Sequence, residues 1–223
     1  MEITRDKDAL KLAGKALENL FREAGNAPIL FLSSGGSVLG ILGEIDENIF
    51  GANFNCGALD ERFSADPAIN NFLQFKEKLH GVYGINWIDS VPEENDDIKT
   101  LTQRMEDGWR NWRRVNPDGE IIITVGMGAD GHVAGIMPKS YAGFEDTGWV
   151  LGYDAGPTVK YPLRVTVTFE FLRSQVDNAI IYISGEEKRP ALERVLADSG
   201  NLSETPARIF REMKNVKIFT DIE

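Results

Sequence analysis

Three short and predominantly apolar runs limit the folds open to this chain of 223 residues more than any other feature. The runs are Pro28–Leu32, Glu120–Val125 and Ala179–Ser184. Runs of this length without polar alternation are typical of strands buried on both faces, as in a parallel sheet. Segments with apolar residues at helical spacing lie between them, for example 10–21 and 97–115. The alternation predicts an α/β protein with a mostly parallel sheet and helices on both faces.

Weaker apolar patterns complete the predicted organisation. Helices are expected at 38–45, 66–80, 186–197 and 207–213, and strands at 53–59, 82–87, 149–153, 163–169 and 216–219. Residues 139–160 have few helix signals and predict a long loop with a short strand, a feature that often covers a site. Because we find no internal repeat or linker, the sequence predicts one domain over residues 1–223.

The charge balance narrows the range of partners. The chain has 24 Lys and Arg residues against 35 Asp and Glu residues, which gives a net charge of −11. A protein this acidic repels nucleic acid and anionic membranes, so neither is an expected partner. If the ligand is an anion, a few local cations and backbone N–H groups must hold it against the overall field.

The single cysteine and the first residues indicate the compartment. Cys56 alone excludes an internal disulfide framework and a cysteine-built zinc site, and we expect it to be a core residue. No His, Cys or carboxylate spacing resembles a metal site, so no metal is expected. Residues 1–10 lack the apolar segment of a signal peptide, and no apolar run approaches the ~20 residues of a membrane span. A cytoplasmic protein is therefore expected.

Four polar segments, each expected to be a loop, follow predicted strands at the point where each strand ends. They cover residues 33–37, 59–63, 126–132 and 184–188. Because open parallel sheets bind ligands at the carboxyl ends of their strands, we expect these segments to converge at one edge of the sheet.

The segment Ser33–Ser37 lies between a predicted strand and the start of a predicted helix. Its sequence, Ser-Ser-Gly-Gly-Ser, lets backbone N–H groups approach an anion near the positive end of the helix, which favours a phosphate cradle. The alternative is a tight turn in which Ser37 is the N-cap. It is not a Walker P-loop, because no Lys-Ser/Thr pair follows the glycines.

Three charges follow the second predicted strand, at Asp60, Glu61 and Arg62. Charges in this position usually face solvent. The functional alternative places a carboxylate and a guanidinium beside the ligand, where arginine grips a phosphate or a developing oxyanion.

The segment 126–132 is the most informative stretch. It formally contains Gly-x-Gly-x-x-Gly, but a dinucleotide fingerprint opens a full helix, and the stretch before Pro138 is too short for one. We therefore do not expect a nicotinamide or flavin cofactor. His132 is the better candidate for a general base, with Asp130 nearby to orient it. The alternative is that His132 only stabilises its loop.

Taken together, the motifs resemble those of a known family. The residues that carry the resemblance are Ser34-Gly35-Gly36-Ser37, Asp60-Glu61-Arg62-Phe63, the stretch 126–138, Asn70-Asn71, Pro162-x-Arg164-x-Thr166-x-Thr168 and Ser184–Lys188. Their order and rough spacing are similar to those of the 6-phosphogluconolactonase family. That family shares a superfamily with glucosamine-6-phosphate deaminase/isomerase, and the resemblance covers nearly the whole chain.

The resemblance implies a fold and an activity. The fold would be a doubly wound α/β sheet related to ribose-5-phosphate isomerase and CoA transferase. The activity would be hydrolysis of 6-phospho-D-glucono-1,5-lactone to 6-phosphogluconate in the pentose phosphate pathway, with a phosphosugar as the only implied partner and without metal or nucleotide.

It also implies roles for individual residues. The loop Ser34, Gly35, Gly36 and Ser37 would hold the phosphate, and Lys188 would add charge. Arg62 would face the phosphate or the lactone oxygen. His132 would activate water, oriented by Asp130. Asp60 matches a carboxylate that the deaminases use as a base.

Two alternatives stay open. The deaminase motif resembles D-G-H-I-A-F-N-E-P, and Met137 stands here in place of its Glu, which favours the lactonase. A non-catalytic sugar-phosphate sensor is the second alternative. The chain also departs from the lactonase pattern at Val38, Val133 and Gly135, so the sequence leaves the precise phosphosugar undetermined, together with the proton donor and the oligomeric state.

Overall fold

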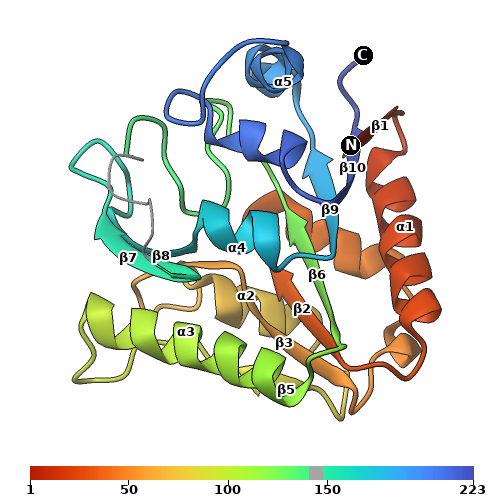
Figure 1. Ribbon diagram of the computed structural model, residues 1–223, viewed down its shortest axis with the longest axis vertical. Coiled ribbons are helices and arrows are strands. Elements are labelled where there is room, and N and C mark those ends of the chain that lie inside the picture. Colours follow the sequence, from red (N-terminus) through yellow and green to blue (C-terminus); the bar gives the residue numbers. More distant parts are fainter. Residues whose placement is uncertain (141–147) are drawn as a thin grey trace.

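The computed structural model describes residues 1–140 and 148–223, and a seven-stranded sheet runs through its centre (Figure 1). The strand order is β1 (Glu2–Arg5), β10 (Asn215–Thr220), β9 (Asn178–Ile183), β6 (Glu120–Val125), β2 (Ile29–Ser33), β3 (Phe54–Ala58) and β5 (Asn86–Ile88). All neighbouring strands in this sheet are parallel, which confirms the predicted α/β class.

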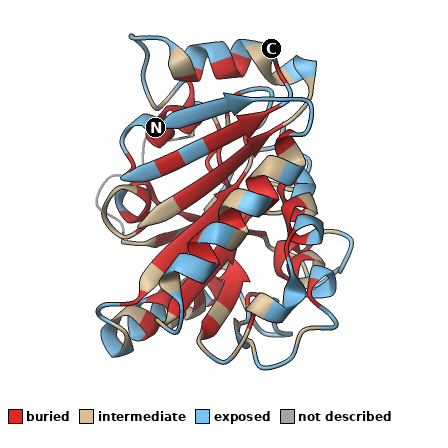
Figure 2. Cartoon of the chain, turned by 90° about the vertical axis from the view of Figure 1, so that its right-hand side faces the viewer, coloured by how far each residue is buried: buried red, intermediate tan, exposed pale blue. Residues whose placement is uncertain are grey.

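Helices cover both faces of this sheet. On one face lie α1 (Ala9–Ala24), α2 (Asn71–Lys78) and a 3-10 helix, Gly36–Glu44. On the other lie α3 (Ile98–Val115), α4 (Phe169–Ser174) and α5 (Arg189–Leu196). Figure 2 shows α1 lying across buried strands, with its outward side exposed. The expected helices on both faces are therefore confirmed.

Strand β2 explains why these runs are predominantly apolar and do not alternate with polar residues. Leu30 and Leu32 belong to the hydrophobic cluster on one face of the sheet, whereas Ile29 and Phe31 belong to the cluster on the other. All four are fully buried. Because successive side chains of a strand point to opposite faces, a strand between two helical layers is apolar at most positions, and the buried hydroxyls of Ser33 and Thr124 pair with each other.

A separate three-stranded sheet was not predicted. It contains β4 (Asp60–Arg62), β8 (Leu163–Val167) and β7 (Val150–Asp154), and both strand pairs are antiparallel. The expectation that 59–63 forms a loop is therefore wrong. The backbone of β4 pairs with β8 instead, and this pairing draws the charged segment into the protein.

Other helix predictions also need correction. The segment expected as a helix at 38–45 is the 3-10 helix Gly36–Glu44, and the one at 207–213 is the 3-10 helix Pro206–Arg211. The helix expected from Asp66 begins at Asn71, because the Asn70 side chain caps it by accepting a hydrogen bond from Leu73 N at 2.8 Å.

Several short elements differ from their predicted bounds or form. The expected strand at 82–87 is reduced to β5, and the helix at 186–197 is a 3-10 turn, Glu186–Lys188, followed by α5. Two elements, β1 and α4, were not predicted. Of the expected loop at 139–160, residues 141–147 lie outside the described residues, and its short strand is β7.

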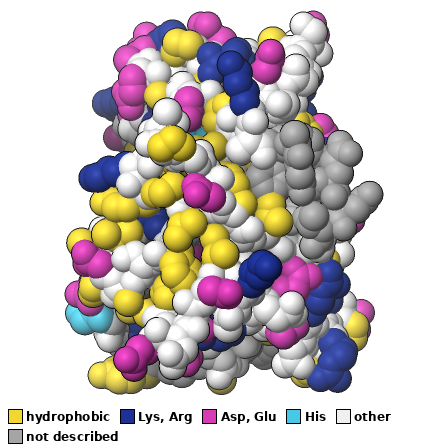
Figure 3. All heavy atoms as spheres, turned by 90° about the vertical axis from the view of Figure 1, so that its left-hand side faces the viewer, with side chains coloured by type: hydrophobic (Ala, Val, Ile, Leu, Met, Phe, Trp, Pro, Cys, Tyr) yellow, Lys and Arg dark blue, Asp and Glu magenta, His cyan; other side chains and the backbone are white. Residues whose placement is uncertain are grey.

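No helix within residues 1–140 or 148–223 is long and apolar enough to cross a membrane. Figure 3 shows the face that carries β7 and β8, where acidic and basic side chains are interspersed with hydrophobic ones. The excess of negative charge is therefore not collected into one patch on this face.

Candidate active site

A cavity of about 290 Å³ lies at the carboxyl edge of the parallel sheet. It is lined by Ser34, Gly35, Gly36, Ser37, Asp60, Arg62, Asn71, Gly126, Met127, Gly128, His132, Ala134, Arg164 and Lys188. All four polar segments contribute to this lining, which confirms the predicted convergence, and Asn71, Ala134 and Arg164 join it from elsewhere in the chain. From β2 the chain continues outward to β3 and β5, whereas β6, β9 and β10 continue in the other direction. The cavity therefore lies at the topological switch point of the sheet, where open α/β sheets bind ligands.

The glycine loop forms one wall of this cavity. Its start is fixed to β6, because Ser34 N donates to Thr124 O at 2.9 Å and Thr124 Oγ1 donates to Ser33 Oγ at 2.8 Å. Gly36 has a φ of +79°, a conformation that favours glycine. The alternative interpretation, in which Ser37 is the N-cap of a tight turn, is wrong, because Gly35 holds that position. Gly36 and Ser37 thus lie in the first turn of the 3-10 helix, with backbone N–H groups and a hydroxyl suited to an anion.

The second wall is the loop after β6, whose glycines fold it around the imidazole of His132. Gly128 N donates to His132 O, and Gly131 N donates to Gly128 O, both at 3.0 Å. A side chain at position 128 would collide with the His132 ring and with Asp130. Gly131 has a φ of +94°. The glycine spacing therefore serves a tight turn under a histidine, and within residues 133–140 no helix follows it.

Asp130 and His132 form a hydrogen-bonded pair. Asp130 Oδ1 lies 2.7 Å from His132 Nδ1 and also accepts His132 N at 3.0 Å. The hydrogen bond with the imidazole, together with the backbone contact, lowers the pKa of Asp130 to about 2 although partial burial opposes this shift. A carboxylate ionised at neutral pH assigns the proton to Nδ1, and Nε2 of the neutral ring is then the acceptor. His132 lines the cavity, whereas Asp130 supports it from behind.

The third wall comes from the small sheet. The interpretation that the charges of β4 face solvent is wrong for Asp60 and Glu61. Asp60 is 4 % exposed and Glu61 is fully buried. Burial raises the pKa of Asp60, and the nearby positive charge of Arg164 opposes that shift. Asn71 Nδ2 donates to Asp60 O at 2.9 Å and to Asp60 Oδ2 at 3.2 Å, which fixes the carboxyl group at the cavity wall.

Glu61 faces away from the cavity and holds the start of α2. Its carboxyl group accepts hydrogen bonds from Asn71 N at 2.6 Å, Phe72 N at 2.9 Å and Arg62 N at 2.8 Å, and from Ser90 Oγ at 3.1 Å. Burial raises the pKa of Glu61 to about 8, although the three backbone amides favour the ionised form. Glu61 thereby positions Asn71, and through it Asp60.

Three cationic side chains line the cavity. Arg62 and Lys188 were expected there. Arg164 belongs to the Pro162–Thr168 motif, for which the resemblance implies no role, yet it is 8 % exposed and lies beside Asp60 and Arg62. Asn71 was likewise matched without a role. An arginine in a short polar-apolar strand gives no signal of its own, because its position depends on pairing with β4.

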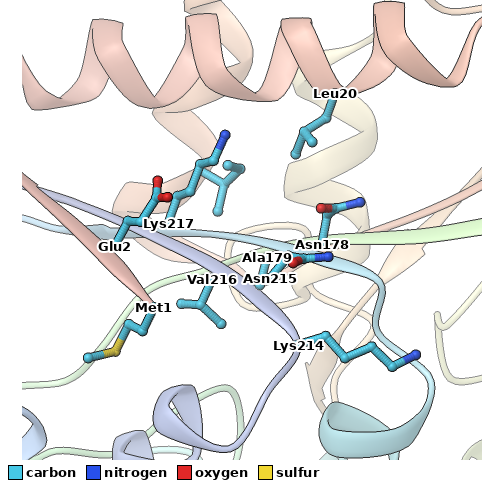
Figure 4. A pocket seen from close by; sticks show the side chains of 10 residues that line it. Met1, Glu2, Leu20, Asn178, Ala179, Lys214, Asn215, Val216 and Lys217 are labelled. Carbon is cyan, nitrogen blue, oxygen red and sulfur yellow. The ribbon is translucent and has the colours of Figure 1, made fainter.

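Other regions of the described structure lack such a constellation. Among residues 1–140 and 148–223, no group of three or more His, Cys, Asp or Glu side chains is arranged to hold a metal ion. A second cavity, shown in Figure 4, lies at the amino ends of β9 and β10 and is lined by Asn178, Lys214, Asn215 and residues of β1 and α1. That edge is opposite to the one where parallel sheets bind ligands.

The comparison with family models decides the family. Residues 7–219 match the model described as glucosamine-6-phosphate isomerases/6-phosphogluconolactonase. The chain belongs to this family. The family unites two reactions, so membership alone does not choose between them.

Curated relatives carry one of these two names. The 6-phosphogluconolactonase of Borreliella burgdorferi is 31 % identical over 104 residues, which cover 46 % of this chain and 43 % of that protein. The 6-phosphogluconolactonase 3 of Arabidopsis thaliana, described as chloroplastic, is 32 % identical over 54 % of this chain and 37 % of that protein. The chain thus matches less than half the length of these relatives.

Solved structures of both kinds share the fold. A 6-phosphogluconolactonase from Trypanosoma cruzi has a TM-score of 0.77 at 20 % identity, over 98 % of this chain and 93 % of that chain. A monomeric glucosamine-6-phosphate deaminase has a TM-score of 0.75 at 17 % identity, over 99 % of this chain and 97 % of that chain. The family fold is therefore present in full, and the choice of reaction depends on the residues of the site.

Proposed function

We propose that this family member hydrolyses 6-phospho-D-glucono-1,5-lactone to 6-phosphogluconate. The observation that carries the proposal is the Asp130–His132 pair, whose imidazole lines a cavity that also contains a glycine loop and three cations. A lactone opens readily, so the protein needs to supply only a positioned base and a grip on the anion. The lactonase names of the curated relatives support this choice.

The glycine loop and Lys188 hold the phosphate in this proposal. Backbone N–H groups of Gly35 and Gly36 and the hydroxyls of Ser34 and Ser37 surround it, and Lys188 supplies a positive charge from the end of β9. Because these groups flank the loop after β6, the bound phosphate fixes the sugar with its C1 toward His132. The local cations offset the field of a chain with a net charge of −11.

The reaction then needs one proton transfer to His132 and one from it. Nε2 of His132 takes a proton from water, and the water oxygen forms a bond to C1 of the lactone. The carbonyl electrons move to the oxygen, and Arg62 stabilises the resulting oxyanion. When the C1–O5 bond breaks, the imidazolium returns its proton to the ring oxygen. Asp130 stabilises the imidazolium between these two steps, which is the role its hydrogen bond allows.

One observation favours a second function. Asp60 is buried at the cavity wall, where a deaminase/isomerase would place a base for an amino-sugar phosphate. The deaminase motif also has a Glu at the position of Met137, and Met137 is apolar and buried here. The site therefore holds one of the two carboxylates, and we rank this reaction second. A sensor without catalysis is the third possibility.

The test compares both substrates with one preparation of the protein. Freshly made 6-phosphogluconolactone is hydrolysed in an assay coupled to 6-phosphogluconate dehydrogenase and corrected for spontaneous opening. Glucosamine 6-phosphate is assayed for ammonia release. We expect acceleration of lactone opening and no ammonia. Ammonia release without lactonase activity would overturn the proposal in favour of the deaminase, and thermal stabilisation by 6-phosphogluconate without either activity would favour the sensor.

A further inference from the structure

The turn 133–137 directly follows His132, and one of its residues has a backbone conformation that needs support. Val133 N donates to Ile136 O at 3.3 Å, and Ile136 N donates to Val133 O at 2.9 Å. Between them, Ala134 has a φ of +50°. A residue with a β-carbon rarely adopts this conformation unless its surroundings impose it. The turn next to the candidate base therefore depends on contacts from outside itself.

The small sheet supplies such contacts. Thr166 of β8 is fully buried, and its Oγ1 accepts a hydrogen bond from Gly135 N at 3.0 Å. The hydroxyl of Tyr153, in β7, donates to Gly135 O at 2.6 Å and accepts a hydrogen bond from Met137 N at 3.3 Å. Both backbone polar groups of Gly135 are thus bonded to side chains of the small sheet, which fixes the turn to that sheet.

The approach of the two segments leaves no room for a side chain at position 135. A β-carbon there would lie 2.8 Å from Cβ of Thr166 and 3.1 Å from its Oγ1. Gly135 is not among the glycines with a positive φ, so its backbone conformation does not require glycine. The close contact with Thr166 requires it instead. The departure from the lactonase pattern at Gly135 therefore accompanies the hydrogen bond that anchors the turn.

The face of the small sheet that contacts the turn also lines the cavity. Tyr153 and Arg164 are partners in the antiparallel register of β7 and β8 (Figure 1), and Thr166 follows Arg164 by two positions. Partner residues, and alternate residues of one strand, extend from the same face of a sheet. Arg164 lines the cavity, as does Asp60, which is the register partner of Thr166 in β4. One sheet face therefore fixes the position of the cavity wall relative to the turn after His132.

We propose that Tyr153 and Thr166 are positioning residues for the general base, because their hydroxyls fix the turn 133–137 so that Nε2 of His132 lies toward the ligand at the cavity wall. Neither residue lines the cavity, so both act through the backbone of the turn. This inference rests on the proposed function, in which His132 is the base. Proton transfer requires that the base lie within hydrogen-bond reach of the attacking water. A small displacement of the ring therefore slows the chemistry and leaves the grip on the phosphate unchanged.

Kinetics and binding of one variant test this inference. Tyr153→Phe keeps the aromatic ring and removes the hydroxyl that bonds to Gly135 and Met137. We expect kcat for lactone opening to fall about 10-fold and the Kd for 6-phosphogluconate to stay within about 3-fold. Tyr83→Phe, at a tyrosine that is 88 % exposed, is the matched control and should keep the wild-type kcat. A wild-type kcat in Tyr153→Phe, or a loss confined to ligand affinity, would overturn the inference.

Two variants of Thr166 separate the hydrogen bond from packing at the same turn. Thr166→Ser keeps the oxygen that accepts Gly135 N, whereas Thr166→Val keeps the shape of the side chain and removes the acceptor. We expect the serine variant to retain kcat within about 3-fold and the valine variant to lose about 10-fold. Equal kcat values in the two variants would mean that packing alone fixes the turn, and the inference would be wrong. This pair also decides the question if Tyr153→Phe fails to fold.

Nuclear magnetic resonance separates this inference from the proposed function. The chain has two histidines, and His80 is exposed and does not line the cavity, so its imidazole signal is an internal reference. Without any ligand, Tyr153→Phe should shift or broaden the Cε1–H signal of His132, assigned with His132→Ala, and leave the His80 signal unchanged. Such a change in a protein without lactonase activity would overturn the function and leave the positioning of His132 intact. Lactonase activity with an unchanged His132 signal and an unchanged kcat in Tyr153→Phe would keep the function and overturn the positioning role.

Discussion

Asp130 and Asp60 approach the same cavity from two different sheets, and their environments push their pKa values in opposite directions. Asp130 follows the central strand β6, remains about half exposed, and has its pKa lowered to about 2 by its contacts with His132. Asp60 begins β4 of the small sheet, is 4 % exposed, and has its pKa raised by burial. Carboxyl groups of one type thus acquire different tasks from their surroundings.

The difference follows from how each sheet ends. A parallel strand of the central sheet releases its loop toward solvent, so Asp130 stays hydrated while its hydrogen bonds stabilise the charge. The small sheet packs its charged strand β4 against β8 and the start of α2, so Asp60 loses water and depends on Asn71 and Arg164. The arrangement of Asp130 suits a carboxylate that stays ionised beside a base. The arrangement of Asp60 suits a carboxyl group that contacts the ligand from a wall that excludes water.

Among variants of these two carboxyl groups and their supports, the largest predicted effect is on Asp130. Asp130→Asn removes the charge that favours the imidazolium and allows the wrong tautomer of His132. We expect kcat for lactone hydrolysis to fall by about 100-fold, with little change in the affinity for 6-phosphogluconate. Coupled kinetics and calorimetry measure the two quantities. A variant with the wild-type kcat would show that Asp130 only shapes its loop.

The next effect concerns the buried carboxyl groups of β4, which make the free energy of unfolding depend on pH. Because the pKa of Glu61 is raised to about 8, the folded protein binds more protons than the unfolded chain between about pH 4.5 and 8. The free energy of unfolding should therefore fall as the pH rises through this window, by an amount on the order of a few kcal/mol. Burial of Asp60 acts in the same direction.

Urea unfolding of the wild type and of Glu61→Gln at pH 5 and pH 8 measures this effect. The glutamine variant removes the titrating group, so its stability should change less between the two pH values. It also serves as the control for the general repulsion within an acidic chain, which both proteins share. Equal pH dependence in the two proteins would mean that the four hydrogen bonds keep Glu61 ionised.

The smallest predicted effect concerns the helix that supports Asn71. Asn70 Oδ1 accepts Leu73 N at 2.8 Å, and its Nδ2 donates to Ser64 O at 3.0 Å. Asn70→Ala should lower the free energy of unfolding by about 1–2 kcal/mol, whereas Asn70→Asp keeps the cap acceptor and should cost less. Thermal or urea unfolding compares the two variants. An equal loss in both would mean that the bond to Ser64, and not the cap, stabilises this turn.

The sequence predicts the half of the site that belongs to the parallel sheet. The strands before Ser34, Asp130 and Lys188 are buried on both faces, so their apolar runs are plain, and the carboxyl ends of parallel strands must meet at one edge. The convergence of the glycine loop with the His132 loop follows from these two facts.

The other half could not be predicted by the same reasoning. Strand β4 has three residues, and β7 is largely half-buried, so neither has a clear apolar pattern. Charges after a strand normally face solvent, and the burial of Asp60 and Glu61 depends on partners that are distant in the chain, such as Thr166 in β8 and Ser90. Long-range pairing of this kind leaves no local trace, which is why Arg164 received no role.

The most direct test of the account is lactone hydrolysis by the wild type and by His132→Ala, measured beside the binding of 6-phosphogluconate to both. We expect the substitution to reduce the enzyme-catalysed rate by about 10²- to 10⁴-fold, because the base is lost, and to leave the Kd for 6-phosphogluconate nearly unchanged, because the glycine loop and the cations remain. A His132→Ala protein that opens the lactone at the wild-type rate would contradict the account.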